Sequence, residues 1–391
     1  MKHEELKKLD QTYVMNTYAR SDVSIDCGRN AICWDLDGKA YIDFGSGIGV
    51  NSLGFCDKEW TAAVTAQLGK LAHTSNLYMT EPQAKLAEQL CGRTGMKRVF
   101  YANSGAEANE GAIKLARKYS EQKYGRQRTG IVTLKQSFHG RTVTTLAATG
   151  QDFFHQYFYP FTEGFRYAPA NDFAGLKAAV DETTCAVMME LIQGEGGVIP
   201  LEKEFVDQAA AFCQENDLLL IIDEVQTGIG RTGKLLCCEH YGLKPDIVTL
   251  AKGLGGGLPI GAVLTGEKSD VFTFTDHATT FGGNPVVCSG ALAVLERIDE
   301  AFLKEVLRKG EKIRSLVMRM KHVEGVDGKG MMMGIRLDDS VKAGEIAKKC
   351  LENGLIVLTA KTKLRFLPPL TITDEEIENG LTILQQVLEQ C

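Results

Sequence analysis

The amino-acid sequence predicts an α/β protein: a large domain in which helices cover a mostly parallel central sheet, and a smaller α+β domain. Three observations support this fold class. Residues 98–265 alternate short β-rich runs with longer helical stretches, which is the pattern of a parallel sheet. The first 50 or so residues and the tail after about residue 290 show a different mixture of short strands and helices. The 391 residues suffice for two packed domains, and no Pro/Ser-rich linker separates them.

The N-terminal segment is predicted to contain a β-hairpin. In the stretch AICWDLDGKAYIDFGSG, Asp37 and Gly38 stand between two apolar runs, and Asp-Gly is a strong turn signal. We expect residues 1–58 to form part of the smaller domain and residues 59–290 to form the large one. Residues 291–391 would complete the smaller domain.

The large domain is expected to contain short, buried strands at residues 98–103, 130–136, 185–193, 218–225, 246–251 and 261–266. After the first strand, AEANEGAIKLARKY predicts a helix with one apolar face, formed by Ala108, Ala112, Leu115, Ala116 and Tyr119. In the C-terminal segment we expect residues 331–333 to be buried, either in a strand or as filling of the core, and residues 374–388 to form an amphipathic helix.

Composition excludes several functional classes. Apolar residues make up 44% and charged residues 24%, and the net charge of -6 argues against a nucleic-acid partner. The longest apolar runs are too short to cross a membrane. The 11 cysteines lack C-x-x-C and zinc-ligand spacing, so we expect no metal. Their odd number, in a chain that begins MKHEELKKLD without an apolar stretch, indicates reduced thiols and a cytoplasmic location.

One glycine-rich stretch resembles nucleotide-binding motifs without their context. GIGRTGK at residues 228–234 satisfies G-x-G-x-x-G and most of the P-loop pattern. However, Leu235 stands where a P-loop needs Ser or Thr, and the following KLLCCEHYGLKPD is a poor helix. We therefore expect no nucleotide site here.

Polar and small residues follow the expected strands, at the edge where parallel α/β sheets bind ligands. Ser104, Gly105 and Ala106 open a helix whose free amides suit a phosphate, although a simple N-cap at Ser104 is the alternative. Asp223 and Glu224 end the most apolar strand. Because a buried carboxylate is costly without a partner, we expect at least one of them to face a cation, with helix capping or core hydrogen bonding as the alternative.

Two further strand ends carry reactive or aromatic groups. In SFHGRT, Phe138 or His139 could stack on a heteroaromatic ring, and Arg141 could bind a carboxylate through two hydrogen bonds. Lys252 follows a buried strand and precedes several glycines, which suits an amine of lowered pKa that attacks a carbonyl. Taken singly, each of these residues has a simpler explanation: the rings could pack in the core, Arg141 could be a surface charge, and Lys252 could be an ordinary lysine at a strand end. Together, a phosphate cradle, a stacking ring, a carboxylate for a ring nitrogen and a Schiff-base lysine are what pyridoxal phosphate requires.

Six motifs occur in a characteristic order: NSGAEANE, FHGRT, IQGEGG, IIDEVQTGIGRTG, LAKGLGGGLPIGA and TTFGGNP. The sequence thereby resembles the class III (subgroup II) pyridoxal-phosphate aminotransferases of fold type I, from MNTYAR near the start to RFLPPLTIT near the end. The resemblance implies pyridoxal 5'-phosphate as the cofactor, small-molecule substrates and a homodimer with shared active sites.

The resemblance implies that the following residues surround the cofactor: Ser104, Gly105, Ala106, Phe138, Asp223, Val225, Gln226, Lys252 and Thr280. In this interpretation Lys252 carries the cofactor as a Schiff base and moves the substrate proton, while Asp223 pairs with the pyridine nitrogen. Phe138 and Val225 pack on opposite faces of the ring, and Gln226 approaches its hydroxyl group.

The same resemblance implies how substrates bind. Arg141 would hold a carboxylate of the amino donor, and Arg365 a carboxylate of 2-oxoglutarate or glutamate. Glu195 would act as a gate that neutralises Arg365 when the donor lacks a second carboxylate, because a buried guanidinium needs a partner. Tyr18 would add a hydrogen bond to the donor, with a packing role as the alternative. Thr279 would touch substrate.

The resemblance also implies a contact across the dimer, since Thr280 would reach the phosphate bound by the neighbouring subunit. Two departures from the family pattern affect the substrate assignment more than the cofactor assignment. Residues 54–58 read Gly-Phe-Cys-Asp-Lys where Gly-His-Cys-His-Pro is common, and Glu190 is followed by Leu191 where proline is usual.

The resemblance implies transamination of N2-acetyl-L-ornithine with 2-oxoglutarate, giving N-acetyl-L-glutamate 5-semialdehyde and L-glutamate in arginine biosynthesis. Ornithine, succinylornithine and 4-aminobutyrate are alternative donors. A pyridoxal-phosphate aminomutase or racemase is a second class, and the presence of Glu195 with Arg365 argues against it. A non-catalytic binding protein is a third class, which Lys252, Asp223 and Arg141 argue against.

Overall fold

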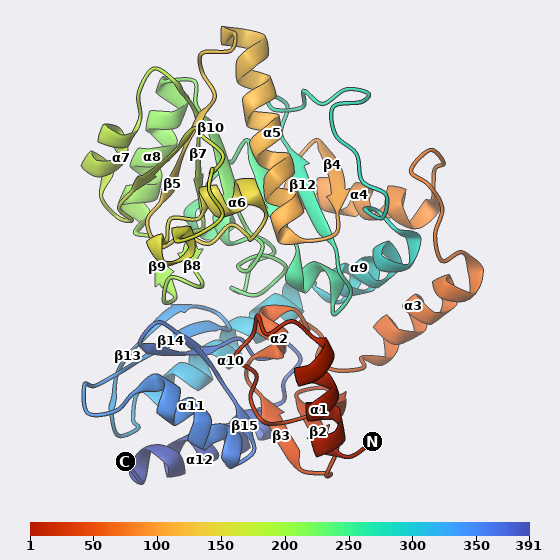
Figure 1. The fold of residues 1–391 in the computed structure, drawn as a ribbon, viewed down its shortest axis with the longest axis vertical. Helices are drawn as coiled ribbons and strands as arrows, with labels where there is room; N and C mark the ends of the chain where they lie inside the picture. Colours follow the sequence, from red (N-terminus) through yellow and green to blue (C-terminus); the bar gives the residue numbers. More distant parts are fainter.

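A central sheet with the strand order β4-β12-β11-β10-β7-β5-β6 organises the larger body of the protein (Figure 1). The computed structural model covers residues 1–391. The strands are β4 (Arg98–Ala102), β5 (Gly130–Leu134), β6 (Phe165–Ala168), β7 (Thr184–Met189), β10 (Leu219–Asp223), β11 (Ile247–Leu250) and β12 (Gly261–Thr265). Neighbouring strands are parallel except β12, which is antiparallel to both β11 and β4.

Helices cover both faces of this sheet, so β5, β7, β10, β11 and β12 are buried at every residue. On one face, α5 (Gly105–Tyr124) packs its apolar stripe against alternate strand residues such as Ile131, Met188 and Ile221. The intervening strand residues face the apolar sides of α4 (Glu81–Thr94), α7 (Phe173–Ala179), α8 (Lys203–Glu215) and α9 (Pro285–Arg297). This two-sided burial explains why the strand sequences are continuously apolar.

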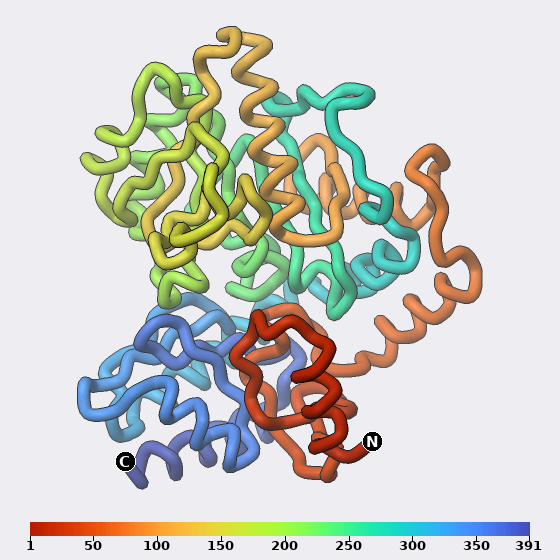
Figure 2. The backbone as a smooth tube through the Cα atoms, viewed as in Figure 1, coloured from red at the N-terminus to blue at the C-terminus, as the bar shows by residue number.

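A second body combines segments from the two ends of the chain, and both termini lie in it (Figures 1 and 2). The antiparallel strands β1 (Ile25–Arg29), β2 (Ile32–Asp35) and β3 (Ala40–Asp43) are joined by β15 (Leu355–Ile356), which is parallel to β3. The antiparallel strands β13 (Val323–Lys329), β14 (Met332–Leu337), β17 (Lys363–Phe366) and β16 (Leu358–Ala360) form another sheet.

Three helices share an apolar core with these two sheets: α10 (Glu300–Val317), α11 (Ala343–Glu352) and α12 (Asp374–Glu389). We propose two domains on this basis, residues 59–290 and residues 1–58 with 291–391, with α9 crossing the second boundary.

The remaining elements are α1 (His3–Tyr13), α2 (Ser46–Gly49), α3 (Lys58–Lys70), α6 (Val143–Ala148), β8 (Ile192–Gln193), β9 (Ile199–Pro200), η1 (Asp152–His155), η2 (Cys237–Tyr241) and η3 (Lys252–Gly255). None of the helices combines the length and apolar character that crossing a membrane requires.

The predicted fold class is confirmed, and so are the N-terminal hairpin, the C-terminal amphipathic helix and the burial of residues 331–333. The predicted strand at residues 185–193 is wrong in its second half. β7 ends at Met189, and β8 pairs with β9 instead, because the buried carboxylate of Glu190 accepts hydrogen bonds from two loop amides and turns the chain.

β6 lies at the sheet edge and was not among the predicted strands. At the unusual segment 54–58, the Asp57 carboxylate accepts hydrogen bonds from the Glu59 and Trp60 amides and caps α3, which explains an acidic residue at this position.

Candidate active site

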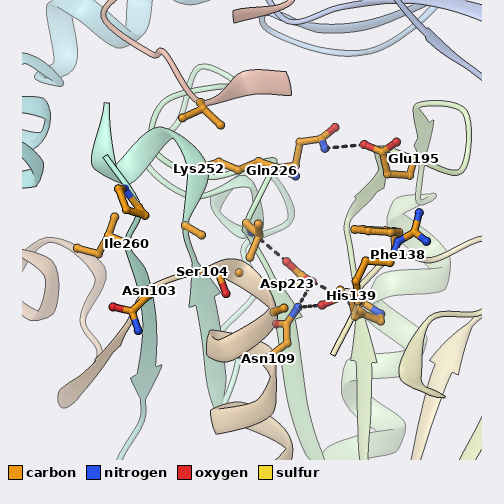
Figure 3. Close-up of a pocket in the computed structure, with 18 of the residues that line it drawn as sticks. Asn103, Ser104, Asn109, Phe138, His139, Glu195, Asp223, Gln226, Lys252 and Ile260 are labelled. Atoms are coloured by element: carbon orange, nitrogen blue, oxygen red, sulfur yellow. Dashed lines mark hydrogen bonds and ion pairs between the residues drawn. The ribbon is translucent and has the colours of Figure 1, made fainter. Parts of the chain in front are cut away.

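A cavity of about 450 Å³ lies where the carboxyl ends of the parallel strands meet (Figure 3). Residues that follow β4, β5, β7, β10 and β11 line it. Because β12 runs antiparallel, its first residue Gly261 pairs with Ala102, the last residue of β4, so residues 257–260 reach the same edge. Val50, from the N-terminal segment, also lines the cavity.

Most of the predicted site residues line this cavity: Ser104, Gly105, Ala106, Phe138, Arg141, Glu195, Asp223, Val225, Gln226 and Lys252. Arg365 reaches it through an ion pair with Glu195. The residues therefore converge from segments that are far apart in the sequence.

Lys252 follows β11 and begins η3 with a φ angle of 40°. This left-handed conformation is unfavourable for a residue with a side chain and is held in place by the surrounding structure. Burial lowers the pKa of Lys252, although the nearby charges of Glu195 and Asp223 act in the opposite direction. No hydrogen bond or ion pair engages its Nζ, so the amine is free to react inside the cavity.

Asp223 is buried and held by hydrogen bonds from three groups (Figure 3). Its Oδ2 accepts from Asn109 Nδ2 at 2.8 Å and from the His139 ring nitrogen Nδ1 at 2.8 Å, and its Oδ1 accepts from the Val225 amide at 3.0 Å. These contacts fix the carboxylate at the cavity wall. His139 is itself buried against Asp223, so of the two candidate stacking rings only Phe138 remains.

Neither strand-end carboxylate forms an ion pair with a lysine or an arginine of the chain, and the ring of His139 is the group beside Asp223. Glu224 accepts hydrogen bonds from the Thr227 hydroxyl and the Cys238 amide, and burial raises its pKa. Core hydrogen bonding, the alternative considered above, therefore describes Glu224. Apart from His139, a cationic partner for Asp223 would have to come from a bound molecule.

The start of α5 presents free backbone amides to the cavity. Ser104 is its N-cap, and its Oγ accepts from the Glu107 amide at 3.1 Å. Gly105 and Ala106 stand in the first helical turn, where no preceding helical carbonyl is available to their amides. A Cβ atom at Gly105 would lie 2.7 Å from Val225 Cγ1, so only glycine allows this close approach.

An ion pair joins the two domains at the cavity wall. Arg365 on β17 is buried, and its Nη1 donates to Glu195 Oε1 at 2.6 Å. Gln226 Nε2 donates to the same oxygen at 3.4 Å (Figure 3). Burial opposes ionisation of Glu195, but Arg365 outweighs it and holds the pKa of Glu195 below its ordinary value. Glu195 is therefore ionised at neutral pH.

Besides Arg365, which reaches the cavity through Glu195, three predicted residues do not line it. Tyr18 is 70% exposed and lies beside Arg20 instead. Thr279 and Thr280 line a second cavity, of about 1000 Å³, although the Thr279 hydroxyl accepts a hydrogen bond from Asn103, which borders the first one. Within one chain, the structure does not bring Tyr18, Thr279 or Thr280 to the site.

Comparison with known proteins agrees with this geometry. The family model Aminotransferase class-III matches residues 13–388. The chain belongs to the class-III aminotransferases.

The aminotransferase is 52% identical to the acetylornithine aminotransferase of Haemophilus ducreyi over 392 residues, covering 100% of both chains. An ornithine aminotransferase structure from Toxoplasma gondii superposes with a TM-score of 0.95 at 31% identity, covering 100% of this chain and 96% of that one. The N-acetylornithine aminotransferase of Stenotrophomonas maltophilia gives a TM-score of 0.84 at 36% identity, covering 98% of each chain.

Class-III aminotransferases depend on pyridoxal 5'-phosphate, and the cavity of this aminotransferase suits that molecule. The buried Gln226 Oε1 has no hydrogen-bond partner, the Lys252 amine is unpaired, and the Gly105 and Ala106 amides are free. A phenolic hydroxyl, an aldehyde and a phosphate would satisfy these groups in turn. The predicted cofactor is confirmed.

Several residues of the aminotransferase site were missed from the sequence, notably Asn109, Glu190 and the contact of His139 with Asp223. Asn109 lies on the buried side of α5, next to Ala108. An amide among apolar helix positions is a signal that could have been noticed, because buried polar groups need partners. The other two contacts depend on chain segments brought together only by folding.

Proposed function

We propose that this aminotransferase transfers the terminal amino group of N2-acetyl-L-ornithine to 2-oxoglutarate, giving N-acetyl-L-glutamate 5-semialdehyde and L-glutamate. Relatives that carry the name acetylornithine aminotransferase, at 52% and 49% identity over 97% or more of this chain, support the choice of donor. The reaction would serve arginine biosynthesis.

The main observation behind the proposal is that one of the two arginines at the cavity has an acidic partner and the other has none. Arg365 is paired with Glu195, whereas no acidic side chain lies within 4 Å of Arg141, which borders the same cavity. A donor with one carboxylate would bind Arg141 and leave the Glu195–Arg365 pair closed. Glutamate and 2-oxoglutarate carry a second carboxylate, which would replace Glu195 on Arg365, so one cavity can serve both substrates.

Pyridoxal 5'-phosphate, when bound, supplies a carbonyl that takes up the substrate amine and a ring that accepts electrons from the broken C–H bond. The residues supply the rest. Lys252 Nζ, with its lowered pKa, takes the proton from the carbon that bears the transferred amine. The fixed carboxylate of Asp223 would hold a proton at the ring nitrogen, and Phe138 and Val225 would confine the ring. The amides of Gly105 and Ala106 would bind the phosphate.

We further propose a homodimer in which Thr280 completes the phosphate site of the partner subunit. The cavity that contains Thr279 and Thr280 is surrounded by exposed apolar side chains: Leu77, Tyr78, Met79, Phe274 and Phe281. Such a patch is unusual on a monomer and typical of a protein interface.

A reducing cytoplasmic location is also proposed, supported by the 11 free cysteines.

Ornithine is the second candidate donor, because the Toxoplasma gondii structure with a TM-score of 0.95 carries that name. Both donors have an α-carboxylate, and they differ in whether the α-nitrogen is acetylated. Succinylornithine and 4-aminobutyrate complete the set of donors to be compared.

A half-reaction screen tests the proposal. The enzyme loaded with cofactor is mixed with each of the four donors, and the loss of the cofactor's absorbance is followed. The highest kcat/KM is expected with N-acetylornithine. A higher value with another donor would replace the proposed substrate, and steady turnover without 2-oxoglutarate would instead indicate an isomerase.

A further inference from the structure

Arg141 is held by an aromatic ring. Its Cζ atom lies 3.8 Å from the centroid of the Phe154 ring and 5.4 Å from that of Phe138. At 3.8 Å the flat guanidinium must lie against the face of Phe154, because the ring atoms block an approach in the ring plane. A nitrogen pointed at the ring would also keep Cζ farther away. This is a close cation–π contact.

The Phe154 ring is itself fixed in place. It lies in η1, where its amide donates to the Gln151 carbonyl at 3.0 Å. Gln151 Nε2 donates to the Ser137 carbonyl at 3.0 Å, and Lys361 Nζ donates to Gln151 Oε1 at 2.8 Å. The Phe138 ring packs against Phe154 with a centroid distance of 6.0 Å and an interplanar angle of 74°. These contacts fix the Phe154 ring relative to the loop that carries Phe138.

A ring and a carboxylate hold an arginine in different ways. Glu195 occupies the hydrogen-bonding edge of Arg365, so an incoming carboxylate has to displace it. Phe154 contacts only the face of Arg141, and the N–H groups of a guanidinium lie in its plane. Arg141 is thus oriented while its donor edge stays free, which reduces the entropy lost when a carboxylate binds.

We propose that Phe154 is a specificity-determining positioning residue: its ring holds the guanidinium of Arg141 so that donors bearing an α-carboxylate are preferred over otherwise identical amines. This inference rests on the proposed binding of the donor carboxylate by Arg141. It assigns substrate preference to a side chain outside the motifs that identified the site.

A matched pair of donors tests the inference. N-acetylputrescine has the same amine, carbon chain and acetamide as N-acetylornithine but lacks the carboxylate. We measure kcat/KM for both in the half-reaction with wild-type enzyme and three variants. Phe154→Leu removes the ring, Phe154→Tyr keeps it, and Tyr157→Leu alters a nearby exposed ring that packs on Phe158 and not on Phe154.

Arg141 is exposed. In Phe154→Leu, kcat/KM for N-acetylornithine should therefore fall roughly twofold to fivefold, mainly through KM, which is the range for a cation–π contact at an exposed site. The value for N-acetylputrescine should equal that of wild type, since no carboxylate is involved. Phe154→Tyr and Tyr157→Leu should both keep the preference.

A double-mutant cycle separates positioning from general damage. Arg141→Ala should remove most of the preference, and adding Phe154→Leu to it should have no further effect. Equal losses for both donors, a preference unchanged in Phe154→Leu, or a loss that persists without Arg141 would each overturn the inference. A wild-type enzyme that does not distinguish the two donors would instead contradict the proposed donor, and the inference with it.

Discussion

At the scale of single residues, Lys252 shows how the fold prepares a reactive group. The strand β11 delivers it into the cavity, its backbone adopts a left-handed conformation, and burial lowers the pKa of its amine. A neutral amine is both a nucleophile and a base, whereas an ammonium group is neither. No other lysine lines the cavity.

Replacing Lys252 by alanine should therefore reduce turnover by about a thousandfold or more, as loss of a positioned base and nucleophile does. After borohydride reduction, the wild-type enzyme should carry the cofactor on the peptide that contains residue 252, and the variant should carry none. Lys268→Ala, which removes an ion pair with Asp217 outside the cavity, is the control. Cofactor fixed to a different lysine in the Lys252 variant would contradict the assignment.

Glu195 is the residue whose replacement should affect the two half-reactions unequally. Glu195→Gln leaves Arg365 without a charge partner when a donor with one carboxylate is bound, but not when glutamate supplies the second carboxylate. We expect kcat/KM to fall about tenfold more for N-acetylornithine than for glutamate, consistent with loss of a charged hydrogen bond. Stopped-flow measurement of each half-reaction tests this, and equal losses would refute the gate.

The same ion pair should make stability depend on pH. The pKa of Glu195 is lower in the folded protein than its ordinary value, so the pair stabilises the fold above the ordinary glutamate pKa. This contribution disappears as the pH falls through the lowered pKa. The stability gap between wild type and Glu195→Gln, from urea unfolding of both proteins, should therefore be larger at pH 7 than in acid. A gap independent of pH would show that the pair adds no charge-dependent stability.

At the scale of secondary-structure elements, six of the seven strands of the central sheet were predictable, because their predicted runs are short, mostly apolar and followed by a glycine or a polar residue. The edge strand β6 was missed, since its sequence FRYA is only partly buried and carries an arginine. Gly105 and Lys252 could be placed at strand ends from local sequence alone. The contact between Arg365 and Glu195, and that of His139 with Asp223, could not, because they join segments that meet only in the folded chain. Family resemblance, and not local pattern, pointed to the first of these.

The turn between β4 and α5 offers a test at this scale. Gly105→Ala would place a Cβ atom 2.7 Å from Val225 Cγ1, so the helix start and the cofactor-facing valine would be pushed apart. We expect the dissociation constant of pyridoxal phosphate to rise about tenfold, since the phosphate amides shift with the turn. Equilibrium dialysis gives the constant. Gly92→Ala, where an added Cβ has open space, is the control and should bind normally.

At the scale of the whole molecule, the proposed homodimer is supported by the second cavity and its exposed apolar border. Thr280 lies there and not in the cavity that contains Lys252. A partner subunit would bury this surface and bring Thr280 to a phosphate that the chain itself does not reach.

Mixed dimers test this arrangement. Thr280→Ala alone should weaken cofactor retention about tenfold, the order expected for one hydrogen bond to a charged group. A heterodimer is then formed from one Thr280→Ala chain and one Lys252→Ala chain. It has one intact site or none, depending on whether Thr280 acts across the interface. Activity of the purified heterodimer distinguishes the two cases. With the substitutions on separate chains, a Thr280 that acts across the interface leaves one site intact and places both defects in the other. A Thr280 that acts within its own chain leaves one defect in each site.

The parallel pairing of β15 with β3 sets a condition on how the protein can be made. Ile42 is synthesised early and its partner Leu355 near the end, so the N-terminal hairpin leaves the ribosome with one edge unpaired. That edge stays open while the whole larger domain is translated, and unpaired strand edges promote association with other chains. A chain that stops before residue 355 lacks β15, so the edge of β3 stays unpaired and open to association even if the central sheet has folded.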